Sequence, residues 1–72
     1  MSGGFVVTEA SCASFFRDKF PTFFGEMRYL LVTGTGPREI AEAGRIWGAS
    51  ELTAGMMESA ACFEHRSLCS RP

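Results

Sequence analysis

The stretch TFFGEMRYLLVT, residues 22–33, decides the fold of this 72-residue chain. Its apolar side chains recur at i, i+1, i+4, i+7 and i+8 from Phe23, which is the spacing of one helical face. The run Tyr29–Val32, taken alone, is rich in strand-forming residues. Because the helical periodicity covers the whole stretch, we predict a helix here, with Thr22 as its N-cap.

Proline and glycine divide the rest of the chain into further helical segments, expected over residues 9–20, 38–47 and 51–68. Gly48 suits a helix stop, and Ser50 suits the N-cap of the last segment. We therefore predict an all-α fold of three or four short helices in one domain spanning 1–72. Residues 1–8 could form an extended arm, and residues 70–72 a frayed tail. The alternative is an α+β fold in which Phe5–Val7 and Tyr29–Val32 are a short strand pair.

The helical stripes also predict which side chains form the core. Its expected members are Phe15, Phe16, Phe20, Phe24, Met27, Leu31, Ile40, Trp47, Leu52, Met56 and Phe63. Small residues in the last segment predict close approach between helices: Ala54, Gly55, Ala60 and Ala61.

Phenylalanine is in surplus for so small a core. Of the seven Phe residues, six lie between Phe5 and Phe24. A chain of this size buries only about 60% of the surface that its unfolded form exposes, so some rings are expected to contact another protein. The predicted contact residues are Phe5, Phe23, Phe24, Met27, Tyr29, Leu30, Ile46 and Met57. We predict a protein–protein interaction module, acting as a homo-oligomer or as an accessory subunit or inhibitor of a larger assembly.

A cysteine–histidine pattern near the C-terminal end suggests a second function. Cys62, His65 and Cys69, with Cys12 far along the chain, are residue types that bind zinc. On a continuous helix, however, the Cα atoms of Cys62 and Cys69 are about 10.5 Å apart, too far for a disulfide or one shared metal. The alternative to protein binding is a structural zinc module that uses some of these residues. If no zinc is bound, no cofactor is expected. A contact between Cys12 and Cys62 or Cys69 is the simpler expectation.

The remaining functional classes find little support in the composition. The net charge is −1, and the seven basic residues are scattered, so a compact nucleic-acid-binding regulator is only the third interpretation. No secretory signal and no membrane-length apolar run is visible, and three cysteines suit a reducing compartment, so we expect a cytoplasmic protein. Cys62 and His65 are within reach on a helix, but nothing supplies an oxyanion stabiliser, so no enzyme activity and no small-molecule substrate is predicted.

The stretch LLVTGTGPREIA, residues 30–41, resembles the opening strand, glycine turn and helix of a dinucleotide-binding fold. Glu39 stands at the third glycine position of that motif, where close packing is needed. Too few residues follow for a doubly wound sheet. We therefore interpret the stretch as an ordinary turn before a helix with Pro37 at its first position.

Overall fold

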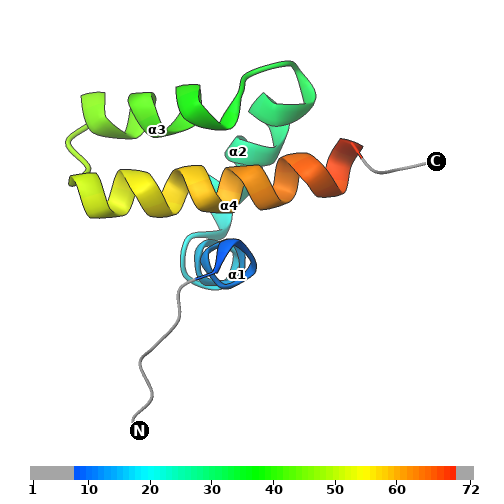
Figure 1. The fold of residues 1–72 in the computed structure, drawn as a ribbon, viewed down its shortest axis with the longest axis horizontal. Helices are drawn as coiled ribbons and strands as arrows, with labels where there is room; N and C mark the ends of the chain where they lie inside the picture. The colour runs from blue at the N-terminus through cyan, green and yellow to red at the C-terminus, as the bar shows by residue number, and fades with distance from the viewer. Residues whose placement is uncertain (1–7, 70–72) are drawn as a thin grey trace, which may run out of the picture.

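Four helices make up most of residues 8–69, the part of the chain that this computed structural model describes. They are α1 (Glu9–Lys19), α2 (Pro21–Val32), α3 (Pro37–Ile46) and α4 (Glu51–Cys69), as Figure 1 shows. Residues 8–69 contain no strand, which confirms the all-α prediction. The strand interpretation of Tyr29–Val32 is wrong because these residues form the last turn of α2. Phe5–Val7, the rest of the predicted arm before Thr8, and the tail 70–72 lie outside the described residues.

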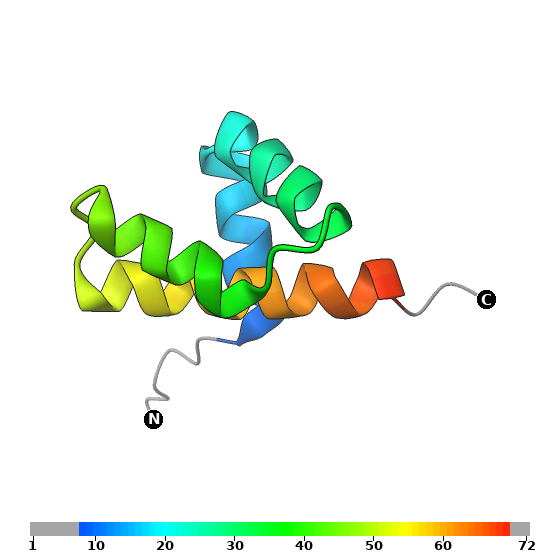
Figure 2. The same ribbon diagram turned by 90° about the horizontal axis from the view of Figure 1, so that it is seen from above.

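The longest helix, α4, organises the others. Helices α3 and α4 lie antiparallel side by side, and α1 crosses α4 at a steep angle (Figures 1 and 2). Helix α2 packs against both α1 and α4. Because α4 contacts all three other helices, its apolar positions form the centre of the core. No helix among residues 8–69 has the length and apolar character needed to cross a membrane.

Local side-chain bonds start two of these helices. The Ser11 N–H donates to Thr8 Oγ1 at 3.0 Å, and the Thr8 N–H donates to Ser11 Oγ at 2.9 Å. Ser50 caps α4 as predicted, since its Oγ accepts a 3.1 Å hydrogen bond from the Thr53 N–H. The prediction for Thr22 is wrong: Phe20 is the N-cap of α2 and Pro21 takes the first helical position, so α2 starts two residues early.

Glycine ends α2 and α3 in the same way. Gly34 and Gly48 have φ angles of 111° and 102°, which disfavour any residue with a Cβ. The Thr35 N–H then donates to the Leu30 carbonyl, and the Ala49 N–H to the Gly44 carbonyl, both at 2.9 Å. Each helix therefore stops sharply, and the second stop folds α4 back along α3.

The stretch that resembles a dinucleotide-binding motif has a different structure. Its first part is the end of α2 rather than a strand. Glu39 Oε1 accepts a 2.6 Å hydrogen bond from the Gly36 N–H, so this carboxylate caps the start of α3. The glycines serve the turn, and the helix N-terminus is occupied by a side chain of the same chain.

The core is smaller than the sequence predicts. Five predicted members are confirmed as buried: Phe16, Phe24, Met27, Leu31 and Ile40. Two more, Met56 and Phe63, are partly buried against this cluster. Small side chains complete it, since Cys12, Ala13, Ala60 and Ala61 are at most 1% exposed. Three of the predicted small residues, Ala54, Ala60 and Ala61, thus allow close approach, whereas Gly55 lies on the surface.

Four predicted core residues are exposed instead. The exposed fractions are 42% for Phe15, 50% for Phe20, 89% for Trp47 and 76% for Leu52. Trp47 and Leu52 lie at the tip of the α3–α4 hairpin, and Phe20 lies at the junction of α1 and α2. Residues at such ends satisfy the helical spacing, but no further element among residues 8–69 covers them.

Candidate interaction surface

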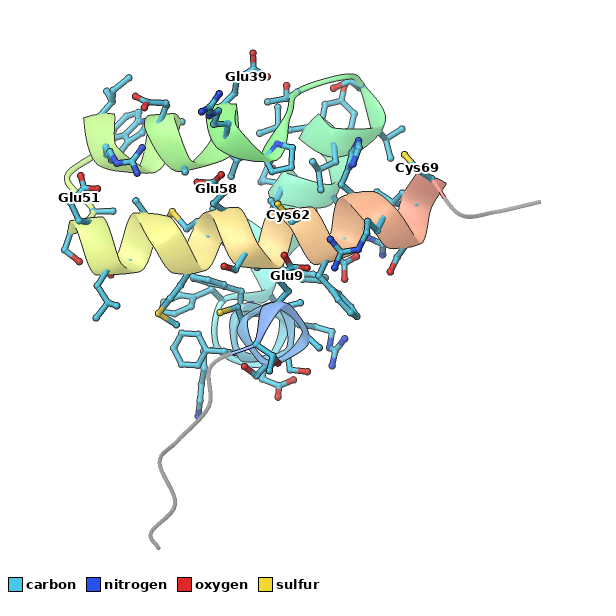
Figure 3. The ribbon with its side chains drawn as sticks, viewed as in Figure 1. Glu9, Glu39, Glu51, Glu58, Cys62 and Cys69 are labelled. Atoms are coloured by element: carbon cyan, nitrogen blue, oxygen red, sulfur yellow. The ribbon has the colours of Figure 1, made fainter. Side chains whose placement is uncertain are left out.

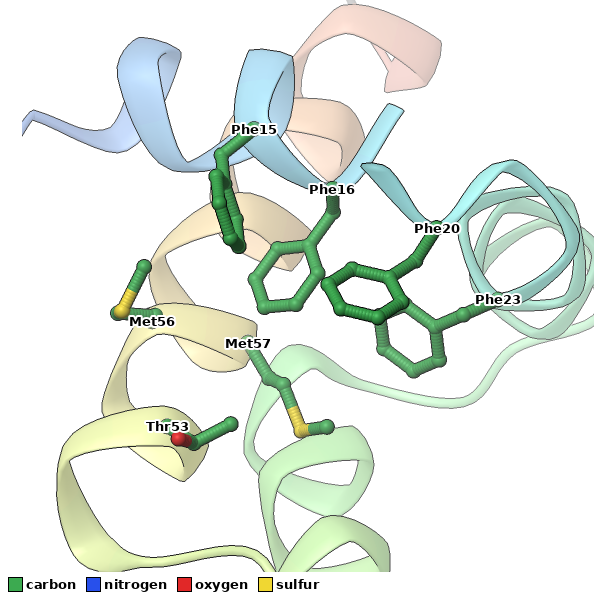
Figure 4. Close-up of a pocket in the computed structure, with 7 residues that line it drawn as sticks. All are labelled: Phe15, Phe16, Phe20, Phe23, Thr53, Met56 and Met57. Atoms are coloured by element: carbon green, nitrogen blue, oxygen red, sulfur yellow. The ribbon is translucent and has the colours of Figure 1, made fainter. Parts of the chain in front are cut away.

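An apolar hollow of about 450 Å³ opens between α1, the start of α2 and α4 (Figure 4). Its lining residues are Phe15, Phe16, Phe20, Phe23, Thr53, Met56 and Met57. Thr53 supplies the one hydroxyl among them, and none is charged. We call this feature the phenylalanine groove.

The rings of the phenylalanine groove pack against one another. Phe16 is the centre, with ring centroids 5.4 Å from Phe15, 6.0 Å from Phe20 and 5.2 Å from Phe23. The edge-on contact between Phe15 and Phe16 is a favourable aromatic geometry. Phe16 is buried by its neighbours, while Phe15 and Phe20 keep roughly half of their surface in solvent. The groove is thus a partly exposed extension of the core.

A second hollow, of about 550 Å³, lies between α2, α3 and the hairpin turn. It shares Phe23 and Met57 with the phenylalanine groove, so the two hollows are neighbours. Trp47 stands at its edge, and Leu30, 38% exposed, lines it from α2. We call it the tryptophan groove. Glu26 is the one charged residue that lines it.

The position of Met57 between the two grooves depends on Gly44 in α3. A Cβ at residue 44 would lie 2.5 Å from Met57 Sδ, closer than atoms can pack. The missing side chain lets the thioether of α4 fit against α3. Because methionine is flexible and polarizable, Met57 can adjust to a bound group on either side.

The predicted contact residues divide into three sets. Phe23 and Met57 line both grooves, and Leu30 lines one. Tyr29 and Ile46 are 65% and 81% exposed but line neither groove. Phe5 lies outside the described residues.

Phe24 and Met27 require a correction. They are 7% and 0% exposed, because their side chains point from α2 into the core of the same chain. They cannot offer surface to a partner. Met27 lies beneath the tryptophan groove without exposing surface to solvent.

The sequence analysis missed the exposed groove residues Phe15, Phe20 and Trp47, which it assigned to the core. A signal was present for two of them. Phe20 precedes Pro21, and Trp47 precedes Gly48, so both stand at helix ends. An aromatic residue beside a helix breaker has fewer covering neighbours than one in mid-helix.

The cysteines and the histidine do not form the single-chain site considered from the sequence. Within residues 8–69 no three His, Cys, Asp or Glu side chains are grouped to hold a metal ion. All three cysteines are free thiols: Cys12 is buried, Cys62 half-buried and Cys69 exposed. Figure 3 shows Cys69 at the end of α4, well apart from Cys62. The zinc set of Cys12, Cys62, His65 and Cys69 and the Cys62–Cys69 pairing are therefore both absent from this part of the chain.

The two less exposed thiols are held protonated. Burial raises the pKa of Cys12 above its ordinary value, and the Glu9 carboxylate raises it further. Burial is also the main cause that raises the pKa of Cys62, again with Glu9 contributing. Both thiols are therefore poor nucleophiles near neutral pH. The close partner of His65 is not Cys62 but Cys69, with His65 Nε2 3.7 Å from Cys69 Sγ.

Comparison of the chain with protein-family models, with curated proteins and with solved structures finds no match. The functional argument therefore rests on the geometry described above.

Proposed function

We propose that this chain is a protein-interaction module that binds the apolar face of another protein segment in its two adjacent grooves. The observation that carries this proposal is the apolar lining that the two grooves share. Phe23 and Met57 belong to both hollows, so the two lie side by side on one largely apolar surface. An apolar surface of this extent on a small protein is typical of an interaction site.

The shape and chemistry of the surface support a helical partner. Helix-in-groove recognition uses apolar side chains at i, i+3, i+4 and i+7 that enter a groove lined by hydrophobic residues. The two grooves offer rings and thioethers from three helices, with Phe20 and Trp47 exposed at their edges. Large aromatic side chains contribute most of the binding energy in many interfaces.

The near absence of charge on the surface indicates what drives binding. Glu26 is the single charged residue among those that line the two grooves. Association should therefore come from burial of apolar area, with weak dependence on salt. The partner is either a second copy of the chain or a different protein, and the mass of a crosslinked product distinguishes the two.

Site-specific photo-crosslinking tests the proposal. A photoreactive phenylalanine analogue replaces Phe20 in the groove or, as the matched control, Tyr29, which is exposed but lines neither groove. In the native cells, we expect one defined crosslinked product from position 20 and none from position 29. The mass of the product shows whether the partner is the same chain or another.

The affinity of the chain for the purified partner that crosslinking identifies completes the test. Phe20→Ser should weaken its binding about tenfold, since loss of an aromatic contact of about 1.4 kcal/mol changes the affinity by that factor. Tyr29→Ser should leave the affinity unchanged. Equal crosslinking from both positions, or equal weakening by both substitutions, would contradict binding in the grooves.

A further inference from the structure

The exposed end of α4 carries a pair of metal-ligating side chains that the grooves do not use. His65 and Cys69 are one helical turn apart, and His65 Nε2 lies 3.7 Å from Cys69 Sγ. Both residues are exposed. The i, i+4 spacing is the one that helices use to present two metal ligands on one face.

The distance between these two atoms matches the edge of a zinc tetrahedron. With a Zn–S bond of about 2.3 Å, a Zn–N bond of about 2.1 Å and a tetrahedral angle, sulfur and nitrogen are about 3.6 Å apart. The pair therefore has the required separation without a change of the backbone. A soft thiolate combined with an imidazole favours zinc over magnesium or calcium.

Two ligands are half of what a closed zinc site needs. A structural zinc ion takes four protein ligands, and no third candidate joins this pair among residues 8–69. A twofold axis provides the missing half, because it brings the same two residues from a second copy. The last turn of α4 projects beyond the other helices, which leaves room for another chain (Figures 1 and 2).

We propose that two copies of this chain share one zinc ion, held by His65 Nε2 and Cys69 Sγ of each copy. Each Cys69 thiol releases its proton to solvent and binds as a thiolate, and each His65 binds through its neutral ring. The two thiolate charges balance the charge of Zn²⁺. His65 and Cys69 are about 12 and about 18 Å along α4 from Met57, and neither lines a groove.

Cobalt substitution tests the site on the purified full chain under a metal-free reductant. Titration with Co²⁺ should give sulfur-to-cobalt charge-transfer absorption and the intense visible bands of tetrahedral cobalt. The signal should saturate at one metal per two chains. Zn²⁺ should displace cobalt, and sedimentation should show a dimer that returns to its metal-free state when a chelator is added.

Three variants identify the ligands. Cys69→Ser and His65→Gln are surface changes and should each weaken metal binding at least tenfold and abolish metal-dependent dimerisation. Cys62→Ser, which alters the half-buried thiol about one turn before His65 and two turns before Cys69, is the matched control and should retain both properties. Far-ultraviolet circular dichroism checks that all three variants keep their helices.

Several results would overturn the proposal. Saturation at one metal per chain, or an octahedral cobalt spectrum, would show that no second copy completes the site. Equal loss of binding in Cys62→Ser would place the metal elsewhere. A dimer that survives both chelator and His65→Gln would be held by a Cys69–Cys69 disulfide or by the grooves rather than by zinc.

Discussion

Two apolar regions along α4 are built from similar residues but differ in how they are covered. The enclosed core lies where Ala60 and Ala61 let α4 approach its neighbours, and there Met27 is 0% exposed. Towards the start of α4, Met56 and Met57 stand at the same surface of the helix, and the grooves open beside them. Around Ala60 and Ala61 the helices pack closely, whereas hollows remain beside Met56 and Met57.

Ion pairs strengthen the same contrast. The buried Glu64 carboxylate lies 3.3 Å from Arg28 Nε and so links α4 to α2. Glu9 pairs with Arg66 and links α1 to the same half of α4. Beside the grooves, Arg45 of α3 bonds Glu51 at 3.0 Å, which closes the hairpin rather than the gap towards α2. Ion pairs thus link the enclosed half to two other helices, whereas the pair beside the grooves lies within the hairpin.

A pair of identical substitutions gives the largest expected effect. Met27→Ala removes a fully buried side chain and leaves a cavity, so the free energy of unfolding should fall by about 2–4 kcal/mol. Met57→Ala, at the partly open position between the grooves, should lower the free energy of unfolding by clearly less. Urea unfolding of both variants measures the difference. Equal losses would mean that the two regions are covered alike.

The next largest effect on stability is expected from the ion pair between Arg28 and Glu64. Arg28→Ala leaves the buried Glu64 carboxylate without its partner, and stability should fall by about 1–2 kcal/mol, less than for a fully buried pair because Arg28 is half exposed. Glu64→Gln in the Arg28→Ala background should recover part of this loss, since it removes the unpaired charge.

Arg17→Ala is the matched control for Arg28. Arg17 and Asp18 form a surface pair at 4.0 Å, which should contribute almost nothing. Thermal unfolding of the parent, of Arg17→Ala and of Arg28→Ala with and without Glu64→Gln measures these differences in stability. A loss in Arg17→Ala as large as in Arg28→Ala would show that burial of Glu64 is not the cause.

Alkaline pH should weaken the enclosed half by a smaller amount. Burial raises the pKa of the Cys12 and Cys62 thiols in the folded chain above the unfolded value of 9.0. Below that value both states are protonated, and the thiols do not change stability. As the pH rises above it, the unfolded chain loses these protons first, so the free energy of unfolding falls until the folded thiols also ionise.

Urea midpoints at about pH 8 and about pH 10 measure this effect. Because alkaline pH also acts on other groups of the chain, the comparison is between the parent and Cys12→Ala, which should lose less stability between the two pH values. Cys69→Ala, at the exposed thiol, is the control and should follow the parent. If Cys12→Ala loses as much stability between the two pH values as the parent does, the buried Cys12 thiol is not the cause.

The sequence predicted the elements of this fold better than its surfaces. Helical spacing, Pro21, Pro37, Gly48 and Ser50 were enough to place four helices, because these signals are local. Which side of a helix is covered depends on neighbours that local spacing does not reveal. Phe24 was predicted both in the core and at a partner surface, and it is buried. Phe15 was predicted in the core and is 42% exposed.

The candidate sites show the same limit. Phe23 and Met57 were predicted as contact residues, and both line the grooves. The cysteine spacing on a single helix excluded a Cys62–Cys69 pair from the start. Whether His65 faces Cys62 or Cys69 depends on the side-chain rotamers, which spacing alone does not determine.

Trp47 gives the smallest expected effect on stability. Its substitution tests whether helical spacing or the exposure in the structure identifies a core residue. Its helical spacing from Ile40 predicts a core tryptophan, whose truncation costs about 3–5 kcal/mol. The structure leaves 89% of Trp47 exposed at the hairpin tip, so Trp47→Ser should change the free energy of unfolding by less than about 0.5 kcal/mol. Leu52→Ser, at the same tip and 76% exposed, should behave alike. A loss of several kcal/mol in Trp47→Ser would mean that the tryptophan groove is closed over its edge in solution. A stable variant with weakened partner binding would show that the largest ring of the chain serves association rather than folding.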